Sequence, residues 1–416
     1  MLYQLFLLIA LTFTSVASAK DHQIDGVPLP QNVKITLPQN ANSPYRQWLG
    51  TWAGAWGDGL KHILVVRSVS SDGKAQIIYA IGANPAIGIK PEWTKHEVTI
   101  SKDKLTISFP GASAAYELMA SGELKAHYAR GFIRAVAVMK KVELDAITKP
   151  GAKLVWKSGK SEFIETDLME DGEPVRLEVV IFKPSGPGPF PLAVINHGST
   201  GRGNDATMFG YTWSDVGLAA FLNQRGWMVA FPQRRGRGKS DGLYDEGFSK
   251  TRSKGYTCDA DISLAGAERA LVDVEAAISV LRARPDVAPS SILIGGQSRG
   301  GILAVAYAGK HPEQVRGVVN FVGGWMGELC PSAKLINETL FKTGASFDHP
   351  TLWLYGKGDP YYSVKHSQGN FEAFRKAGGK GEFNVFDVPG KYGHYVAGYE
   401  ELWGDVLDKY LRTLTK

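Results

Sequence analysis

Apolar runs alternate with helix-like segments over residues 151–416, and few architectures accommodate that rhythm. The runs that resemble buried strands are "PLAVIN", "WMVAFP", "SILIG", "VRGVVNFVG" and "TLWLYG". The most periodic helix-like segment between them covers residues 260–284. Strands without polar alternation are buried on both faces, as in parallel sheets that helices cover on both sides. The sequence therefore predicts an α/β domain, with a doubly wound and mostly parallel sheet, over residues 151–416.

The chain before this domain follows a shorter rhythm. "HILVVRSV" and "AQIIYAIG" are separated by the turn "SSDGK", and "EVTIS" and "LTISFP" by "KDK". Period-two alternation with tight turns predicts antiparallel hairpins, and no amphipathic run of helix length interrupts them. A chain of 416 residues favours two domains. We expect a small all-β domain over residues 20–150, a barrel or sandwich of about six to eight strands.

The β domain opens with "WLGTWAGAW", which places Trp48, Trp52 and Trp56 four residues apart. One interpretation is an aromatic binding platform, and the other is a plug at the end of a small barrel. The set Gly50-Thr51-Trp52 resembles the start of lipocalin-like barrels, which favours the plug.

The N-terminus carries the longest apolar run of the chain. Leu5–Val16 is shorter than the roughly twenty residues that span a bilayer, and it is followed by the small residues of Ala17-Ser18-Ala19. This pattern predicts a signal peptide over residues 1–19, a secreted or periplasmic mature protein, and no stable membrane insertion after cleavage. No Lys or Arg precedes the run, so an uncleaved membrane anchor is the alternative.

Cysteine content and charge limit cofactors and partners. The two cysteines, Cys258 and Cys330, are expected to form a disulfide in an oxidising compartment, with two buried thiols as the alternative. No CxxC, HExxH or His/Cys cluster is present, so we expect no metal and no cofactor. The net charge of +6 is modest, and its densest basic stretch, Arg234–Ser240, has no nucleic-acid-binding fold around it. We expect no nucleic-acid partner, and the oligomeric state stays open.

Three polar residues follow the predicted strands at the edge where parallel sheets bind ligands. Ser298 follows "SILI", Asp359 follows "TLWLYG" and His394 follows "EFNVFDV". A strand that turns directly into a helix forces a left-handed backbone at the turn, and the neighbours Gly296 and Gly300 remove side chains that would collide there. The pattern predicts an exposed serine hydroxyl beside a helix N-terminus.

The outer glycines of this stretch, Gly295 and Gly301, are expected to tolerate a side chain better than the inner pair.

The pentapeptide Gly296-Gln297-Ser298-Arg299-Gly300 matches the nucleophile elbow of the α/β-hydrolase family, and the resemblance covers most of residues 155–416. The stretches "NHGS", "GWMVAFPQRRGRGKSDG" and "LYGKGDPYYSV" look most like dienelactone-hydrolase-like and prolyl-oligopeptidase-like hydrolases. Dienelactone hydrolases proper use a cysteine nucleophile. Ser298 departs from them and points to ester hydrolysis of the serine type.

A serine hydroxyl needs a base, and that base needs a group to orient it. We expect His394 to be the base, with His197 and His366 as rivals. Asp359 is expected to orient the imidazole, and Asp387 is the weaker candidate for that role. The resemblance implies that the backbone N–H groups of Ser199 and Arg299 form the oxyanion hole.

The loop "RRGRGKSDG" is expected to line one side of the cleft. Arg234 and Arg235, with His197, are candidate substrate-binding residues, since an arginine can clamp a substrate carboxylate. The alternative is an arginine ion-paired with Asp241 or with an acid of the following loop. Residues 241–261 lack a core pattern and are expected to form a lid over the site.

These observations favour an exported serine hydrolase that cleaves the carboxylic ester of a small-molecule or oligomeric substrate. A prolyl-oligopeptidase-type peptidase is the second hypothesis, although the β domain is too short for a propeller, whose blades need about forty residues each. A third is a non-catalytic protein on a hydrolase scaffold, with the Trp-rich β domain binding a carbohydrate or lipid. The acyl and alcohol groups of the substrate stay open.

Overall fold

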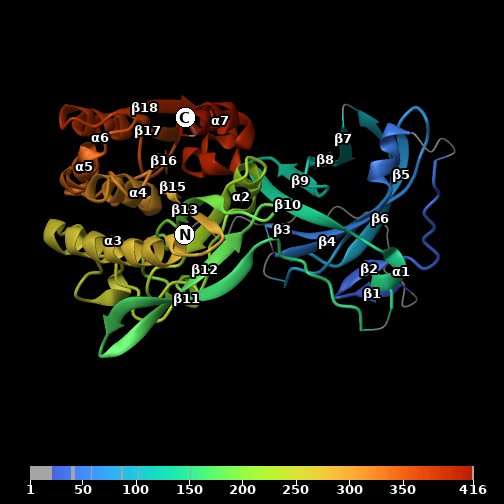
Figure 1. Ribbon diagram of the computed structural model, residues 1–416, viewed down its shortest axis with the longest axis horizontal. Helices are drawn as coiled ribbons and strands as arrows, with labels where there is room; N and C mark the ends of the chain where they lie inside the picture. The colour runs from blue at the N-terminus through green and yellow to red at the C-terminus, as the bar shows by residue number, and fades with distance from the viewer. Residues whose placement is uncertain are drawn as a thin grey trace. The chain divides into compact units, whose positions relative to one another are not determined.

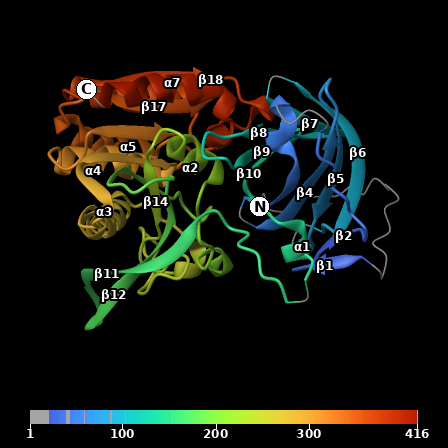
Figure 2. The ribbon, with the colours of Figure 1, turned by 45° about the vertical axis from the view of Figure 1, so that its right-hand side comes forward.

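The computed structural model describes residues 21–414, except 39–42, 58, 86–87, 102 and 150. The expected signal peptide therefore lies outside the described residues. The chain divides into two compact units, Met1–Ser158 and Gly159–Lys416 (Figures 1 and 2), which are described separately. The division lies a few residues beyond the expected boundary between residues 150 and 151.

The first unit is built around a closed eight-stranded barrel with the strand order β10-β3-β4-β5-β6-β7-β8-β9. All neighbouring strands are antiparallel. The strands are β3 (Gly50–Trp56), β4 (Leu60–Val69), β5 (Lys74–Ile81), β6 (Glu92–Ser101), β7 (Lys104–Phe109), β8 (Ala112–Leu118), β9 (Leu124–Arg130) and β10 (Ile133–Val142). The expected all-β barrel is confirmed.

Successive side chains of a barrel strand point alternately to the inside and the outside of the barrel. In β4, Leu64 and Val66 belong to the inner core, while Ile63 and Val65 belong to a second core on the outer face. The strands β1 (His22–Ile24) and β2 (Val27–Leu29) and the helix α1 (Leu144–Ile147) supply side chains to this outer core. The first unit therefore has two cores, one on each side of the same strands.

The three tryptophans of "WLGTWAGAW" are buried in the inner core. The Trp52 indole N–H donates to the Trp48 carbonyl at 3.0 Å. In a barrel of eight strands the interior is just wide enough for side chains to fill it. The plug is therefore the correct interpretation, and the exposed aromatic platform is wrong.

His62 lies among these aromatic rings inside the barrel. Its Nδ1 is 2.8 Å from the Ala80 carbonyl and its Nε2 is 2.8 Å from the Tyr116 hydroxyl, while the Trp56 ring stacks on it at 5.2 Å. The carbonyl can only accept, so Nδ1 carries the proton and Nε2 accepts from Tyr116. Burial lowers the pKa of His62 from 6.5 to about 4, so the ring is neutral in the folded barrel.

Because this imidazole is buried, we predict that the stability of the barrel depends on pH. Between pH 6.5 and about pH 4 the unfolded chain binds a proton at His62 that the folded barrel does not bind. Stability present above pH 6.5 is therefore lost as the pH falls towards 4, by about 1.4 kcal/mol per pH unit. Pulse proteolysis in urea, with the cleavage sites located by mass spectrometry, measures this loss for the barrel within the whole chain. His62→Gln should remove this part of the pH dependence, and equal slopes in both proteins would contradict the assignment.

The second unit is built on an eight-stranded sheet with the order β11-β12-β14-β13-β15-β16-β17-β18. β12 is antiparallel to both of its neighbours, and the strands from β14 to β18 in this order are parallel. The strands are β11 (Lys160–Glu170), β12 (Glu173–Phe182), β13 (Phe190–Asn196), β14 (Met228–Pro232), β15 (Val287–Gln297), β16 (Gly317–Phe321), β17 (Thr351–Gly356) and β18 (Gly381–Phe386).

Helices cover this sheet in two groups (Figure 1). They are α2 (Val216–Asn223), α3 (Ala260–Arg282), α4 (Arg299–Lys310), α5 (Ala333–Thr343), α6 (Val364–Lys376) and α7 (Glu400–Leu414). α2 packs on α7, while α3 packs on α4, α4 on α5 and α5 on α6. The expected α/β domain is confirmed. No helix of the described part of the chain is long and apolar enough to span a membrane.

Two elements of this unit are absent from the sequence-based expectation. The strand β11 pairs with β12 through a tight turn in which Asp171 and Gly172 both have positive φ angles, 52° and 85°. An Asp-Gly pair between two strands is a strong hairpin signal, and it was present in the sequence. The helix α5 follows Ser332 between β16 and β17, where only strands were expected.

Candidate active site

Ser298 occupies the junction between a strand and a helix. β15 ends at Gln297 and α4 begins at Arg299, so Ser298 alone makes the turn, with φ 57° and ψ −122°. The Ser298 N–H donates to the Phe321 carbonyl at 2.9 Å, which ties the turn to the end of β16. A non-glycine residue in this conformation costs about 1–3 kcal/mol and persists only where its surroundings impose it. The expected positive φ is confirmed.

The inner glycines make room for this turn. A Cβ on Gly296 would lie 2.4 Å from the Gly300 carbonyl carbon, and a Cβ on Gly300 would lie 2.0 Å from the Asn196 carbonyl oxygen. Both obstacles are backbone atoms, which cannot rotate away as a side chain can. The requirement for glycine at both positions is confirmed.

Gly301 is also crowded, so its expected tolerance is wrong, whereas Gly295 has more room than the inner pair, as expected. A Cβ on Gly301 would lie 2.4 Å from Asn320 Oδ1 and 3.0 Å from Gly323 Cα, because the first turn of α4 packs against the chain at the end of β16. A Cβ on Gly295 would lie 3.0 Å from the Val319 carbonyl oxygen.

Gly300 provides a test of this close approach. Gly300→Ala is expected to lower the free energy of unfolding by at least about 3 kcal/mol, since the added methyl group meets fixed backbone. Gly369→Ala is a matched control, because Gly369 lies within α6 with no atom within 4 Å of the added carbon. It should be neutral or stabilise the protein by about 0.5–1 kcal/mol. Urea unfolding measures both, and equal stability of the two variants would contradict the packing described.

The structure brings Asp359 and His394 together. Asp359 Oδ2 lies 2.8 Å from His394 Nδ1. Asp359 Oδ1 accepts from the backbone N–H groups of Tyr361 at 2.8 Å and Tyr362 at 3.1 Å, so both oxygens of this buried carboxylate are held. The rival Asp387 is instead exposed and forms an ion pair with Lys357.

Ser298 lies beside this pair. Gln297 Nε2 donates to the His394 carbonyl at 2.9 Å, which joins the elbow to the loop after β18. Tyr362 packs against the His394 ring, with the two ring centres 5.7 Å apart, and its hydroxyl donates to the Gly324 carbonyl at 2.8 Å. Among the described residues no hydrogen bond joins Ser298 Oγ directly to the His394 ring. The turn that carries Ser298 and the loop that carries His394 are therefore joined through Gln297.

The other candidate histidines have different surroundings. His197 is buried, its Nε2 accepts from the Arg234 N–H at 3.2 Å, and its Nδ1 lies 2.8 Å from the Gly198 carbonyl. Burial, together with the charge of Arg234, holds the pKa of His197 well below its usual range. His366 lies on α6, where its Nε2 is 3.1 Å from Asn337 Nδ2. His197 is thus a neutral residue that supports the turn after β13, which favours neither its role as a base nor its expected contact with substrate.

The turn formed by His197, Gly198 and Ser199 passes directly against the serine. A Cβ on Gly198 would lie 3.2 Å from Ser298 Cβ and 3.8 Å from its Oγ. On the other side, Arg299 is the first residue of α4, where backbone N–H groups have no partner within the helix. The two expected oxyanion donors, Ser199 and Arg299, therefore belong to segments adjoining Ser298, and their role stays a prediction.

Arg234 and Arg235 are both held in buried ion pairs. Arg234 Nε lies 2.6 Å from Glu246 Oε1, and Arg235 Nε lies 2.6 Å from Asp273 Oδ1. Removing one partner of a buried ion pair leaves an uncompensated charge at a cost of about 3–5 kcal/mol. Both arginines are therefore occupied by acids of the protein, as the ion-pair alternative expected, and are not free to bind a substrate carboxylate. Asp241, the other expected partner, pairs with Arg176 on β12.

Glu246 is an acid of the loop that follows "RRGRGKSDG", as the ion-pair alternative expected, although the sequence did not single it out. Besides Arg234, it forms an ion pair with Arg299 at 3.3 Å. Burial alone would raise the pKa of Glu246, but the charges of these two arginines outweigh burial and lower it. The Arg299 guanidinium also lies between the rings of Tyr256 and Trp325, at 3.7 and 4.2 Å from their centres. The side chain of Arg299, the residue after Ser298, is therefore held by buried ionic and aromatic contacts.

Residues 241–261 were expected to lack a core pattern, but the segment contains aromatic side chains that are buried and packed against one another. Tyr244 and Phe248 are buried and lie 5.0 and 5.9 Å from the ring of Phe209. The Tyr256 hydroxyl accepts from the Thr200 N–H at 3.2 Å, directly after the turn that faces Ser298. Aromatic side chains pack this segment, which contains only a short 3-10 helix (Arg252–Lys254) before α3 begins.

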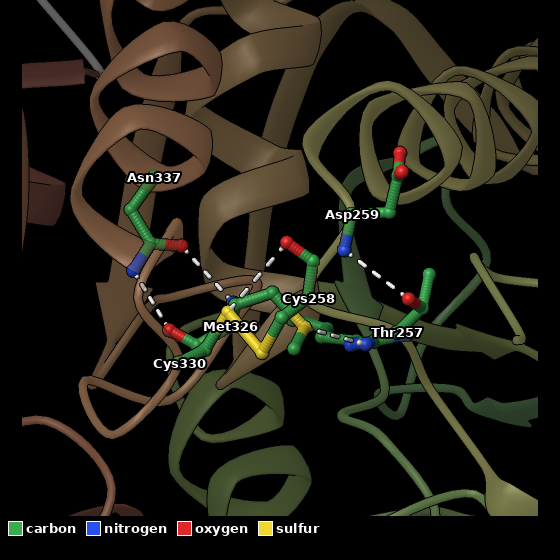
Figure 3. The surroundings of a disulfide bond; sticks show 7 residues. Thr257, Cys258, Asp259, Met326, Cys330 and Asn337 are labelled. Carbon is green, nitrogen blue, oxygen red and sulfur yellow. Dashed lines mark hydrogen bonds between the residues drawn. A yellow bond between two sulfur atoms is a disulfide. The ribbon is translucent and has the colours of Figure 1, made fainter.

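The two cysteines are joined in the structure. Figure 3 shows the disulfide between Cys258, which precedes α3, and Cys330, which precedes α5. Next to it, Asn337 Oδ1 accepts from the Met326 N–H at 3.0 Å and Asn337 Nδ2 donates to the Met326 carbonyl at 2.9 Å. The cysteines are 72 residues apart, and closing a loop of that length stabilises a fold by about 4 kcal/mol in the chain-entropy account. The bond fixes residues 241–261 to the loop after β16.

This arrangement defines an α/β-hydrolase fold: a mostly parallel sheet, a strained serine between its fifth strand and the following helix, and an Asp–His pair at later strand ends. Residues 205–391, which lie within the second unit, match the model of the dienelactone hydrolase family. The resemblance inferred from the sequence is confirmed. Within the described residues, no group of three or more His, Cys, Asp or Glu side chains is arranged to hold a metal ion.

Several solved structures are similar to this chain. Est1E from Butyrivibrio proteoclasticus, with ferulic acid bound, is 15% identical with a TM-score of 0.43, and the match covers 61% of this chain and 100% of Est1E. A putative dienelactone hydrolase from Klebsiella pneumoniae is 21% identical with a TM-score of 0.38, covering 62% and 98%. A prolyl endopeptidase is 13% identical with a TM-score of 0.39, covering 84% of this chain and 50% of that one. No curated protein sequence matches the chain.

Proposed function

We propose that this protein is an exported serine hydrolase that cleaves carboxylic esters through an acyl-enzyme. The observation that carries the proposal is the 2.8 Å Asp359–His394 pair beside a serine held in a left-handed turn. A serine hydroxyl becomes a useful nucleophile when an oriented base is near it. The strain at Ser298 has no evident structural purpose in the sheet, which supports a catalytic one.

The proposed mechanism assigns one role to each group. Asp359 accepts a hydrogen bond from the Nδ1–H of His394, which keeps the proton on Nδ1 and leaves Nε2 free to act as a base. Nε2 takes the Ser298 proton as Oγ attacks the ester carbonyl carbon, through an Oγ–Nε2 hydrogen bond that forms when the substrate binds. The backbone N–H groups of Ser199 and Arg299 stabilise the tetrahedral oxyanion.

Collapse of the tetrahedral intermediate completes the cycle. The acyl C–O bond breaks, His394 gives its proton to the departing alkoxide, and the acyl group stays on Ser298 Oγ. Water then attacks this acyl-enzyme with the help of the same base, and the carboxylic acid leaves. No redox step or external co-reactant other than water is needed.

Two features favour an ester over a peptide bond as the substrate. Residues 205–391 of the second unit match the dienelactone hydrolase family model, and the first unit is a barrel rather than a propeller. Hydrolysis of p-nitrophenyl acetate, compared with that of a proline p-nitroanilide, tests this choice. Faster hydrolysis of the proline p-nitroanilide than of p-nitrophenyl acetate would favour the peptidase. Hydrolysis of neither substrate would favour the non-catalytic hypothesis.

Export rests on the sequence of residues 1–19 and on the disulfide, which persists in oxidising compartments. N-terminal sequencing of the protein recovered from the medium or periplasm should begin at Lys20. A protein that keeps Met1 and stays with the membrane would support the anchor instead.

A further inference from the structure

Two exposed tyrosine side chains contact the ring of the candidate catalytic histidine, and an exposed leucine lies on a segment that is hydrogen-bonded to one of these tyrosines. Tyr361 is 41% exposed, Tyr395 is 52% exposed and Leu329 is 92% exposed. The Tyr361 ring meets the His394 ring edge-on at 4.7 Å, and the Tyr395 ring meets it edge-on at 6.1 Å. We call Tyr361 and Tyr395 the aromatic rim.

Leu329 is held in place although it is exposed. Its neighbour Glu328 donates its backbone N–H to the Tyr361 carbonyl at 2.9 Å, and Glu328 Oε2 accepts from the Ser363 hydroxyl at 2.7 Å. Its other neighbour, Cys330, is buried and disulfide-bonded. Exposed apolar groups that cluster on an ordered surface mark places where a ligand binds.

The chemistry of the proposed reaction says which part of the substrate meets the rim. His394 gives its proton to the oxygen of the leaving alcohol, so that oxygen must come within hydrogen-bond distance of the imidazole. Groups packed on the imidazole and open to solvent therefore face the alcohol side of the ester. Tyr361 is such a group, because its ring is packed against His394 and is also exposed.

We propose, on the basis of the proposed esterase function, that the aromatic rim selects esters whose alcohol carries a ring. The ring is either aromatic or the apolar face of a sugar, since both offer a flat surface to the exposed Tyr361 side chain. In the reaction, the acyl C–O bond breaks, water supplies the hydroxyl group of the acid, and the ring-bearing alcohol leaves with the proton from His394. Tyr361 is a specificity-determining residue in this proposal and takes no part in proton transfer.

The test compares acetate esters that differ in the alcohol alone. Benzyl acetate and ethyl acetate release alkoxides of similar basicity, so the ratio of their kcat/KM values reports on contacts with the ring. We expect wild type to prefer benzyl acetate about tenfold, Tyr361→Phe to keep that ratio, and Tyr361→Ala to bring it close to one. Leu335→Ala removes another exposed leucine, on α5, and should leave the ratio unchanged.

An acetylated methyl glycoside is the third substrate and separates the two kinds of ring. If Tyr361→Ala lowers kcat/KM more for the glycoside than for benzyl acetate, the preferred alcohol is a sugar. If it lowers kcat/KM more for benzyl acetate, the preferred alcohol is aromatic. An active Tyr361→Ala enzyme with the wild-type ratios overturns this inference and leaves the esterase proposal standing. A wild-type protein that hydrolyses none of the three esters overturns the proposed function, and the inference with it.

Discussion

Replacing Ser298 by alanine is expected to lower kcat for p-nitrophenyl acetate by about 10⁴-fold or more, with the fold intact. The substitution removes the attacking oxygen, while the backbone that forms the elbow and the first N–H groups of α4 stay in place. The remaining rate would come from the oxyanion donors and substrate binding alone. Initial rates with purified protein, alongside circular dichroism, measure the effect.

Ser290 provides the control for this variant. It lies exposed near the amino end of β15, the same strand that ends beside Ser298. Ser290→Ala should keep the wild-type rate. An active Ser298→Ala enzyme would remove this serine from the mechanism.

Asp359→Asn is expected to lower kcat by about 10⁴-fold with little change in KM. The Asn oxygen can still accept from the backbone N–H groups of Tyr361 and Tyr362, so the loop should keep its shape. The Asn amide, however, donates a hydrogen bond towards His394 Nδ1 and forces the imidazole proton onto Nε2. An imidazole protonated at Nε2 cannot take the Ser298 proton.

Asp387→Asn is the matched control, since this exposed carboxylate pairs with Lys357. It should retain most of the activity in the same assay. If Asp387→Asn lost most of the activity and Asp359→Asn stayed active, Asp387 rather than Asp359 would be the residue that orients His394.

The positions of the three candidate catalytic residues were predictable because a parallel sheet brings the ends of its strands together. Ser298, Asp359 and His394 each follow an apolar run, and the runs became β15, β17 and β18. The steric argument for Gly296 and Gly300 also needed only local geometry. The barrel was predictable for a similar reason, because period-two alternation is a local property of each strand.

The partners of buried charges were not predictable, because pairing across the fold leaves no periodic signal. Arg234 and Glu246 are 12 residues apart, and Arg235 and Asp273 are 38 residues apart, with no motif between them. Taken alone, "RRGRG" is typical of an exposed basic loop. The structure buries both arginines because acids from an irregular segment and from α3 meet them there.

Gly301 was misjudged for a related reason. The space beside it is set by Asn320, near the carboxyl end of β16, and by Gly323 in the loop that follows β16. Local reasoning could fix the turn around Ser298 but not the packing of α4 against its neighbours.

Covalent labelling with a fluorophosphonate probe tests the central claim most directly, because the probe reacts with a serine only where a base and an oxyanion site activate it. The proposed mechanism predicts that mass spectrometry of the digested protein finds the probe on the peptide containing Ser298, and that Ser298→Ala carries no label. A wild-type protein that stays unlabelled, or that carries the label on another residue, would contradict it.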